Sequence, residues 1–305
     1  AQTGILGIPT CGIQRKNWIG EFEDGSKDGM IPQMSTSCHK FEKSDPLKQI
    51  PILYENEDVL ILNKPSGILS QKAVASDYSL NEQIVEYYKW KGGSLSLFTP
   101  SVCNRLDRNT SGIILAGMSL KGTQMLSRVL KARTIDKYYL TIVCGTVTQA
   151  TTIKGFLCKK KNHNQVVIFR TKEEALTNGY QEAAFIETQY QPLAHGKSGK
   201  ENFTLLKVKL VTGKTHQIRA HLKSVGHPII GDGKYGLKSV NAYIKSAFGI
   251  RHQLLHAFYI HFPEDIDNVL AGKSFTAMPE KPFLQAIYAM FDSIQSKEDL
   301  EKKML

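Results

Sequence analysis

Short apolar segments separated by polar turns dominate the sequence from residue 50 onward. Ile50–Tyr54 and Val59–Asn63 are two such segments, with the polar turn Glu55–Asp58 between them. Short apolar and β-branched runs bounded by turn residues are typical of strands. Further strands are expected at residues 112–117, 137–143, 151–157, 165–169, 183–189 and 203–211. Because helices are few and many connections are short, the pattern predicts an α+β protein with a largely antiparallel sheet.

Helices are expected where apolar residues recur at helical spacing behind a capping residue. Ser79 and Glu82 form a capping-box pattern that opens a helix ending near Gly92. Three more helices are expected at residues 119–132, 215–224 and 282–303. The last of these is amphipathic, and we expect it to pack on the rest of the protein.

The first 48 residues differ from the rest, because glycine and proline interrupt them and no apolar period is sustained. We therefore divide the chain into an N-terminal extension of unclear structure (1–48), a main domain (49–280) and a C-terminal amphipathic helix (281–305). No apolar run approaches the roughly 20 residues that span a bilayer. The N-terminus lacks the pattern of a signal peptide. The five cysteines are scattered without a C-x-x-C pair, which favours a reducing, cytoplasmic location.

Basic residues outnumber acidic ones by 39 to 28, a net charge of +11. Such an excess favours a polyanionic partner, although charge alone is weak support. The excess is local: Lys159–Lys161 form a basic hairpin tip, and residues 205–230 contain no acidic residue. Both regions would suit contacts to phosphates, and each could equally be a solvated surface.

One carboxylate in the sequence lies between two arginines. Asp107 stands between Arg105 and Arg108, in a polar segment that precedes an apolar strand. Nearby cations favour the ionised carboxylate, which is the form that a nucleophile or an electrostatic stabiliser needs. The alternative is a structural salt bridge that holds a loop.

A second polar cluster opens the helix expected at Thr215. Its first-turn N–H groups would form a seat for an anion. Ile218 and Leu222 should pin this helix to the core, so that Arg219 emerges beside the buried stripe near the N-terminal end. Arg219 could also be an ordinary surface cation.

We expect no metal site. His216 and His221 would lie about 140° apart on a helix, on different faces, and could not bind one ion together. A metal-dependent nuclease is disfavoured because Asp107 is a single carboxylate between arginines, whereas two-metal chemistry uses several.

Tyr138 and Tyr139 are neighbours in an expected strand. They should face opposite sides of the sheet, so only one of them can line a given cleft. That tyrosine could stack on a nucleobase, or it could pack in the core.

Six motifs, in this order, resemble those of the RluA-type pseudouridine synthases, specifically the RluC- and RluD-like branch that acts on large-subunit ribosomal RNA. They are Asn63–Gly67, Asn104–Gly112, Lys137–Tyr139, Thr212–His221, Gly226–Asp232 and Leu254–Ala257. The resemblance covers roughly residues 50 to 265 and makes the main domain the catalytic one. It implies a mixed, mainly antiparallel sheet in two halves, with peripheral helices and a central RNA-binding cleft. It also implies that a flipped uridine is converted to pseudouridine without a cofactor or a metal.

The resemblance assigns roles to individual residues. Asp107 is similar to the family's catalytic aspartate, Tyr139 to the tyrosine that stacks on the base, and Arg219 to the arginine that pairs with the aspartate. Arg105 matches an arginine associated with base flipping, and Leu255 an apolar wall of the pocket. The expected substrate-binding residues are Arg105, Leu255, Lys214, His216 and Asn104.

Three residues depart from the family's usual pattern: Asn104 stands for His, Asn109 for Asp and His252 for Arg. Asn104 and Asn109 flank Asp107 without replacing it, so these departures concern the flipping geometry more than the chemistry. The resemblance favours large-subunit ribosomal RNA as the substrate, with transfer RNA as the alternative. A catalytically silent RNA-binding or ribosome-assembly protein on the same scaffold is the rival class. We expect a monomer.

Overall fold

The structure, a computed structural model, describes residues 44–160, 164–266 and 268–305. Most of the expected N-terminal extension and Lys161 of the basic hairpin lie outside these residues. Residues 43–305 form one compact unit. Leu47 and Ile50 are buried in its largest core cluster, so the core begins just before the boundary expected at residue 49.

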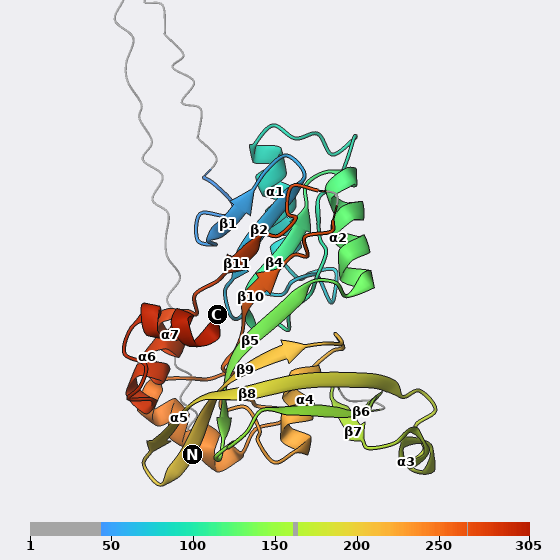
Figure 1. Ribbon diagram of the computed structural model, residues 1–305. Coiled ribbons are helices and arrows are strands. Elements are labelled where there is room, and N and C mark those ends of the chain that lie inside the picture. The colour runs from blue at the N-terminus through green and yellow to red at the C-terminus, as the bar shows by residue number, and fades with distance from the viewer. Residues whose placement is uncertain (1–43, 161–163, 267) are drawn as a thin grey trace, which may run out of the picture. The chain divides into compact units, whose positions relative to one another are not determined.

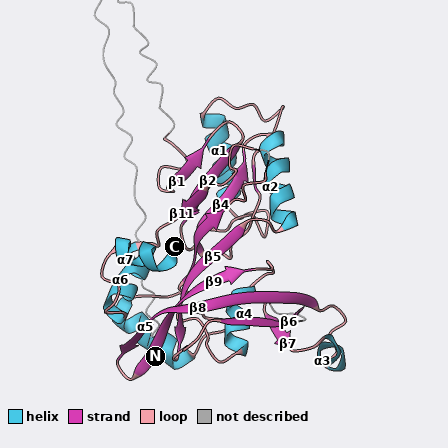
Figure 2. Ribbon diagram, viewed as in Figure 1, coloured by secondary structure: helices cyan, strands magenta, loops and turns pink. Residues whose placement is uncertain are grey.

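In the described part of the chain, eleven strands form one sheet (Figures 1 and 2). The strands are β1 (Ile52–Glu55), β2 (Val59–Lys64), β3 (Ser101–Val102), β4 (Ser111–Gly117), β5 (Asp136–Cys144), β6 (Thr151–Lys159), β7 (Val166–Phe169), β8 (Ala184–Ser198), β9 (Glu201–Leu210), β10 (Leu255–His261) and β11 (Ser274–Thr276). Their main order is β1-β2-β4-β10-β5-β9-β8-β6-β7, with β3 beside β4 and β11 beside β10. The β4–β10 pair is parallel and the other pairs of strands are antiparallel. The mixed, mainly antiparallel α+β class is therefore confirmed.

The helices are α1 (Leu80–Trp90), α2 (Leu120–Ala132), α3 (Lys172–Thr177), α4 (Gln217–Ser224), α5 (Lys238–Phe248), α6 (Lys281–Met290) and α7 (Lys297–Met304). The single helix expected at residues 282–303 is wrong, because the backbone of Phe291 is extended and ends α6. A new capping box, formed by Ser296 and Asp299, then begins α7. In the residues that the structure describes, no helix is long and apolar enough to cross a membrane.

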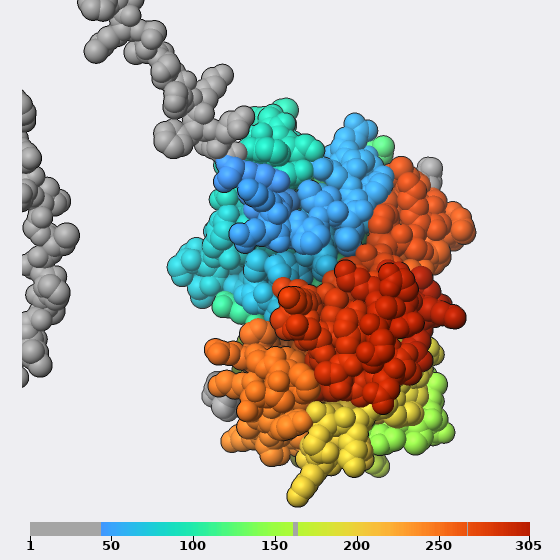
Figure 3. Space-filling model, turned by 90° about the vertical axis from the view of Figure 1, so that its left-hand side faces the viewer, coloured from blue at the N-terminus to red at the C-terminus, as the bar shows by residue number. Residues whose placement is uncertain are grey.

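The sheet is covered by helices on both faces. The largest core cluster lies on one face and includes residues of α1 and α4. On the opposite face, α2 packs on one end of the sheet, and α5, α6 and α7 pack on the other. In Figure 3, α6 and α7 lie in the dark red area, and α5 lies in the orange area below and to the left of it. β2 shows the alternation that produces the two faces, since Leu60 and Leu62 join the first cluster and Val59 and Ile61 the α2 cluster.

β8 runs nine residues further than the expected strand end at residue 189. Pro192 in its middle is tolerated because the pairing with β9 shifts register between Pro192 and Ala194. A bulge is one of the few places where a strand accepts proline.

A short parallel contact joins the β1–β2–β4 part of the sheet to the part that begins with β10. β4 and β10 pair only at Ser111–His256 and Gly112–Ala257. Gly112 has a φ of +112°, and a Cβ added there would lie 2.3 Å from the Ala257 carbonyl oxygen. Gly112 is therefore required both by the backbone conformation and by the approach of β10.

Replacing Gly112 by alanine is expected to lower the free energy of unfolding by about 2 kcal/mol or more, because the side chain is strained at positive φ and collides with β10. Urea unfolding measures this change. Gly213→Ala is the matched control, since a Cβ there meets nothing within 4 Å. We expect the control to change stability by less than about 0.5 kcal/mol. Equal unfolding midpoints for the two variants would contradict the close-contact argument.

Candidate active site

Asp107 lies in the loop between β3 and β4, and the backbone around it is fixed. The Leu106 N–H donates to Ser70 Oγ at 3.0 Å, and that hydroxyl donates to the Leu106 carbonyl at 2.9 Å. The Thr110 N–H donates to the Asp107 carbonyl at 3.0 Å. The Asp107 side chain remains 23% exposed. The loop thus holds a reachable carboxylate on an immobile backbone.

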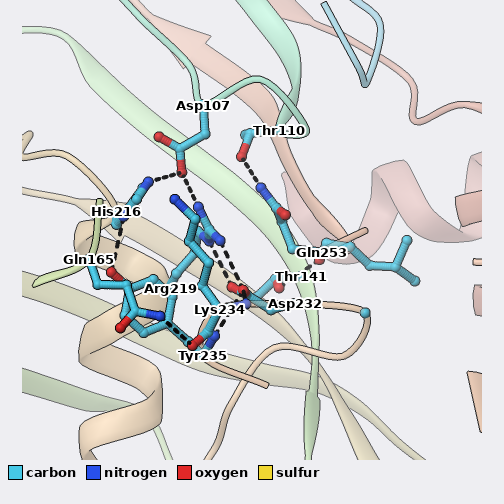
Figure 4. Close-up of polar contacts among 12 residues, drawn as sticks. Asp107, Thr110, Thr141, Gln165, His216, Arg219, Asp232, Lys234, Tyr235 and Gln253 are labelled. Atoms are coloured by element: carbon cyan, nitrogen blue, oxygen red, sulfur yellow. Dashed lines mark hydrogen bonds and ion pairs between the residues drawn. The ribbon is translucent and has the colours of Figure 1, made fainter. Parts of the chain in front are cut away.

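Arg219 of α4 reaches Asp107 from the other end of the sheet (Figure 4). Its Nη1 donates to Asp107 Oδ2 at 2.7 Å. Its Nε and Nη2 donate to the two oxygens of Asp232 at 2.7 and 2.9 Å. Arg219 therefore holds two carboxylates at once through short, charge-assisted hydrogen bonds.

Asp232 is completely buried and was not singled out from the sequence. Burial would raise its pKa, but hydrogen bonds from Arg219 and from the N–H groups of Lys234 and Tyr235 hold the pKa below its usual value. Burial likewise opposes the charge of Arg219, yet the two carboxylates raise its pKa. Asp232 and Arg219 therefore both stay charged. A sequence signal existed, since Asp232 is the first acidic residue after the acid-free stretch at residues 205–230.

The arginines that flank Asp107 in the sequence do not pair with it, which corrects the expectation from their spacing. Arg108 points to Asp77, 3.9 Å away, and Arg105 is exposed without an ion pair in the described part of the chain. Adjacent side chains in non-helical backbone point in different directions. The cation that neutralises Asp107 thus comes from a distant segment.

α4 begins at Gln217, two residues later than expected, because His216 adopts a left-handed φ of 56°. Gln217 anchors this end of the helix. Its amide oxygen accepts from the Thr212 hydroxyl and the Lys214 N–H, and its amide nitrogen donates to the Glu187 carbonyl and to Thr188 Oγ1. The four hydrogen bonds position the first turn, which carries Arg219.

His216 lies between Asp107 and Tyr235. Its Nε2 is 3.9 Å from Asp107 Oδ2, and its Nδ1 is 3.0 Å from the Tyr235 hydroxyl. Burial lowers the pKa of His216, which favours the neutral ring. His216 therefore belongs to the same cluster as Asp107 and Arg219.

Tyr139 and Leu255 lie on the same face of the sheet as this cluster. Tyr139 of β5 is opposite Ala257 of β10, and Leu255 is opposite Thr141. Both are nearly buried, and they share one core cluster. Burial raises the pKa of Tyr139, and the charge of Asp107 raises it further, so the phenol stays protonated.

Tyr138 faces the other side of the sheet, as the alternation predicted. Its ring lies 5.9 Å from that of Tyr259, and Lys207 Nζ is 4.7 Å from its centroid. Of the two neighbouring tyrosines, Tyr139 is the one on the side of Asp107.

Two of the expected substrate-binding residues have other surroundings. The Asn104 amide donates to the Ile113 carbonyl and accepts from the Leu115 N–H, so both of its groups are bonded to β4. Lys214 is exposed, and its backbone N–H supports Gln217. Asn104 is thus part of the framework, and Lys214 is a free surface cation.

Lys64 was also missed as an individual residue, although it lies in the Asn63–Gly67 motif. It is fully buried, and its Nζ donates to the carbonyls of Pro65, Ile68 and Arg108 at 2.8, 2.9 and 3.1 Å. Burial lowers the pKa of Lys64 to about 7, against the opposing effect of Glu280 and Asp107. Lys64 ties β2 to the loop of Asp107.

Two of the three departures from the family's usual pattern lie together. Asn109 and His252 line one pocket of about 160 Å³, with Glu280 and Phe283 among its other walls. Asp107 is not part of its lining. The pocket therefore lies beside the Asp107 loop and does not contain the reactive carboxylate.

The two histidines of the α4 segment have separate partners, as their spacing predicted. His216 bonds to Tyr235, whereas His221 Nδ1 lies 3.0 Å from Thr188 Oγ1. Within residues 44–160, 164–266 and 268–305, no three side chains of His, Cys, Asp or Glu are grouped as metal ligands.

Comparison with known proteins gives a consistent result. A family model described as RNA pseudouridylate synthase matches residues 58–224. Ribosomal large subunit pseudouridine synthase C of Pasteurella multocida is 34% identical over 231 residues, which are 75% of this chain and 64% of that protein. RNA pseudouridylate synthase domain-containing protein 1 of Danio rerio is 26% identical over 262 residues, 85% of each chain. The match thus spans just under two thirds of the Pasteurella protein.

Solved structures agree with these sequence matches. Human RNA Pseudouridylate Synthase Domain Containing 1 superimposes with a TM-score of 0.61 at 25% identity, covering 84% of this chain and 94% of that one. A second human protein, RNA Pseudouridylate Synthase Domain Containing 4, has the same fold, with a TM-score of 0.60, 19% identity and coverage of 78% and 91%.

Because Lys64 is buried, we expect the free energy of unfolding to depend on pH. Its pKa is about 7 in the folded protein, against 10.5 for a free lysine. The unfolded chain therefore binds more protons between pH 7 and 10, and the free energy of unfolding should rise with pH in that range. Lys64→Met should reduce the slope by at most about 1.4 kcal/mol per pH unit.

Urea unfolding at pH 7, 8 and 9 checks this expectation. Lys245→Met, on the exposed surface of α5, is the control and should keep the wild-type slope. If Lys64→Met also kept that slope, the burial of a titrating Lys64 would be disproved.

Proposed function

The chain belongs to the RNA pseudouridylate synthase family, and on that premise we propose that it isomerises uridines in RNA to pseudouridine with Asp107 as the catalytic carboxylate. The observation that carries the proposal is the Asp107–Arg219–Asp232 cluster. It presents one partly exposed, ionised carboxylate at the edge of an otherwise buried charge network. The motif and the geometry both support Asp107 in this role.

The two oxygens of Asp107 have different environments. Oδ2 accepts from Arg219 and faces His216, whereas Oδ1 has no partner in the described part of the chain. We infer that Oδ1 is the reactive oxygen, which attacks the ribose or takes a proton from it. Arg219 orients the carboxylate for either step through the 2.7 Å hydrogen bond to Oδ2.

The reaction itself is an isomerisation. The C1′–N1 bond breaks, the uracil turns, a C1′–C5 bond forms, and the proton lost from C5 is balanced by one gained at N1. Nothing is oxidised or reduced, so the residues have to provide a nucleophile or a base, an oriented uracil and protection from water. Asp107 provides the first of these.

Tyr139 and Leu255 would form the wall against which the flipped uracil lies. Flipping costs a few kcal/mol, and stacking on an aromatic ring returns about 1–3 kcal/mol. The Tyr139 hydroxyl has no hydrogen-bond partner among the described residues and is free to contact the base. Its raised pKa makes it a donor at neutral pH.

The exposed cations would hold the RNA backbone. Arg105 lies two residues from Asp107, Lys214 lies before α4, and Lys159 and Lys160 are exposed at the end of β6. Phosphate contacts of this kind position an RNA without reading its sequence. We propose large-subunit ribosomal RNA as the substrate, supported by the similarity to ribosomal large subunit pseudouridine synthase C of Pasteurella multocida.

Asp107→Asn is expected to remove pseudouridine formation, with a rate loss of at least about 10³-fold, because the amide can neither attack nor accept a proton. The dissociation constant for the RNA should change little. Single-turnover assays and RNA-binding titrations on the two proteins measure both quantities. Asp292→Asn, an exposed aspartate, is the control and should be fully active.

Undiminished activity of Asp107→Asn would overturn the assignment of the catalytic residue. A wild-type protein that binds RNA yet forms no pseudouridine in any RNA would instead support the silent RNA-binding protein.

The target is tested by mapping pseudouridine in total RNA from cells with and without this protein. We expect one or a few sites in large-subunit ribosomal RNA to disappear with the protein and to return with the wild-type chain but not with Asp107→Asn. Loss of sites from transfer RNA alone would contradict the ribosomal assignment while leaving the reaction intact.

A further inference from the structure

The Tyr235 hydroxyl links the β6–β7 hairpin to the Asp107 cluster. The Val166 N–H, at the start of β7, donates to Tyr235 Oη at 2.8 Å. On its other side, Tyr235 Oη lies 3.0 Å from His216 Nδ1. Figure 4 shows Tyr235 below His216, with Asp107 beyond the ring. One hydroxyl thus contacts both the hairpin and the histidine that faces Asp107.

These contacts favour one position for the proton of His216. Tyr235 Oη already accepts a hydrogen bond from the Val166 N–H. Among the described residues, His216 Nδ1 is the one acceptor within reach of the Tyr235 hydroxyl hydrogen. A neutral imidazole that accepts at Nδ1 carries its hydrogen on Nε2. The Nε2–H group then faces Asp107 Oδ2 at 3.9 Å.

The backbone of His216 is strained into this position. Among the described residues, His216 and Arg133 are the only non-glycine residues with positive φ. A left-handed conformation costs an ordinary residue about 1–2 kcal/mol, and such residues concentrate at functional sites. His216 is also buried, at 8% exposure, so its ring has no solvent partner to replace Tyr235.

The Tyr235 ring contributes packing as well as its hydroxyl. The Arg219 guanidinium lies 5.2 Å from the ring centroid, and the His216 ring meets it edge-on at 5.6 Å. Removing the hydroxyl alone would leave these ring contacts in place. The hydrogen bonds can therefore be tested separately from the packing.

Lys234, next to Tyr235, makes two further hydrogen bonds to the hairpin. Lys234 Nζ donates to the Asn164 carbonyl at 2.7 Å, and Gln165 Nε2 donates to the Lys234 carbonyl at 3.4 Å. The N–H groups of Lys234 and Tyr235 both donate to Asp232 Oδ1. The segment 232–235 thus bonds to the hairpin on one side and to the Arg219 partner on the other.

We propose that Tyr235 is a positioning residue that fixes the Nε2–H tautomer of His216 toward Asp107 and couples this carboxylate to the β6–β7 hairpin. Tyr235 acts through His216 and does not itself contact the substrate. The expected effect of Tyr235 on turnover rests on the proposed function of Asp107. The expected tautomer of His216 does not depend on that function.

The tautomer is measured by nitrogen-15 NMR of histidine-labelled full-length protein, with the His216 signals assigned by His216→Gln. We expect the wild type to carry the proton on Nε2. Tyr235→Phe keeps the ring and removes the hydroxyl, so Nδ1 loses its donor and the signals should shift toward a mixture of tautomers. In the same variant, kcat should fall about tenfold, as for the loss of one hydrogen bond, with KM within about twofold.

Tyr243→Phe is the matched control. It also removes a bonded tyrosine hydroxyl, since Tyr243 Oη lies 2.7 Å from Ser198 Oγ, but on α5 and away from Asp107. This variant should keep both the His216 tautomer and kcat of the wild type.

An Nδ1–H tautomer in the wild type would overturn the proposal, whether or not Tyr235→Phe folds. Unchanged His216 signals in a folded Tyr235→Phe variant would also overturn the proposal, and so would an unchanged kcat in that variant. A fully active Asp107→Asn would sink the proposed function instead, and the NMR result would still decide the link between Tyr235 and His216.

Discussion

Arg219 shares one positive charge between two carboxylates, and the site is organised around this sharing. Asp232 is fully buried and could not remain ionised without it. Asp107 is the exposed partner, so the same guanidinium that stabilises a buried charge also orients a reachable one. Removing one partner of a buried ion pair is costly because the other is left unpaired. The α4 helix, the Asp107 loop and segment 232–235 are therefore held in one fixed arrangement.

This arrangement separates a rigid side of the site from a reactive side. Lys64, Ser70 and Gln217 hold the backbone and make all their hydrogen bonds to protein groups. Within the described residues, Asp107 Oδ1 and the Tyr139 hydroxyl have no hydrogen-bond partner, and in the proposed function they are the groups that a flipped base would meet. Preorganised groups of this kind need no rearrangement at the moment of reaction. The exposed cations lie outside this framework, where mobile side chains can follow an RNA backbone.

Most of the strands could be predicted because each is an apolar run ended by turn residues. The elements that escaped prediction lack such local signals. α5 follows Leu237, an N-cap residue whose side chain makes no capping hydrogen bond, and α3 has only six residues, too few for an apolar period. β10 was not expected as a strand, although its Leu-His-Ala motif was singled out, because its first four residues are all buried and show no alternation. β3 and β11 are so short that only their pairing partners define them.

The sequence by itself determined the class of fold and the family, and it singled out Asp107, Tyr139 and Arg219 as candidates, because apolar periodicity and ordered motifs carry this information. Only the tertiary structure decided which charges meet. Arg105 and Arg108 are adjacent to Asp107 in the chain yet point away, while Arg219, 112 residues later, makes the ion pair. The sequence likewise did not indicate the contacts that Asp232, Lys64 and Tyr235 make. Which charged side chains meet depends on packing between distant segments, and no local pattern encodes those contacts.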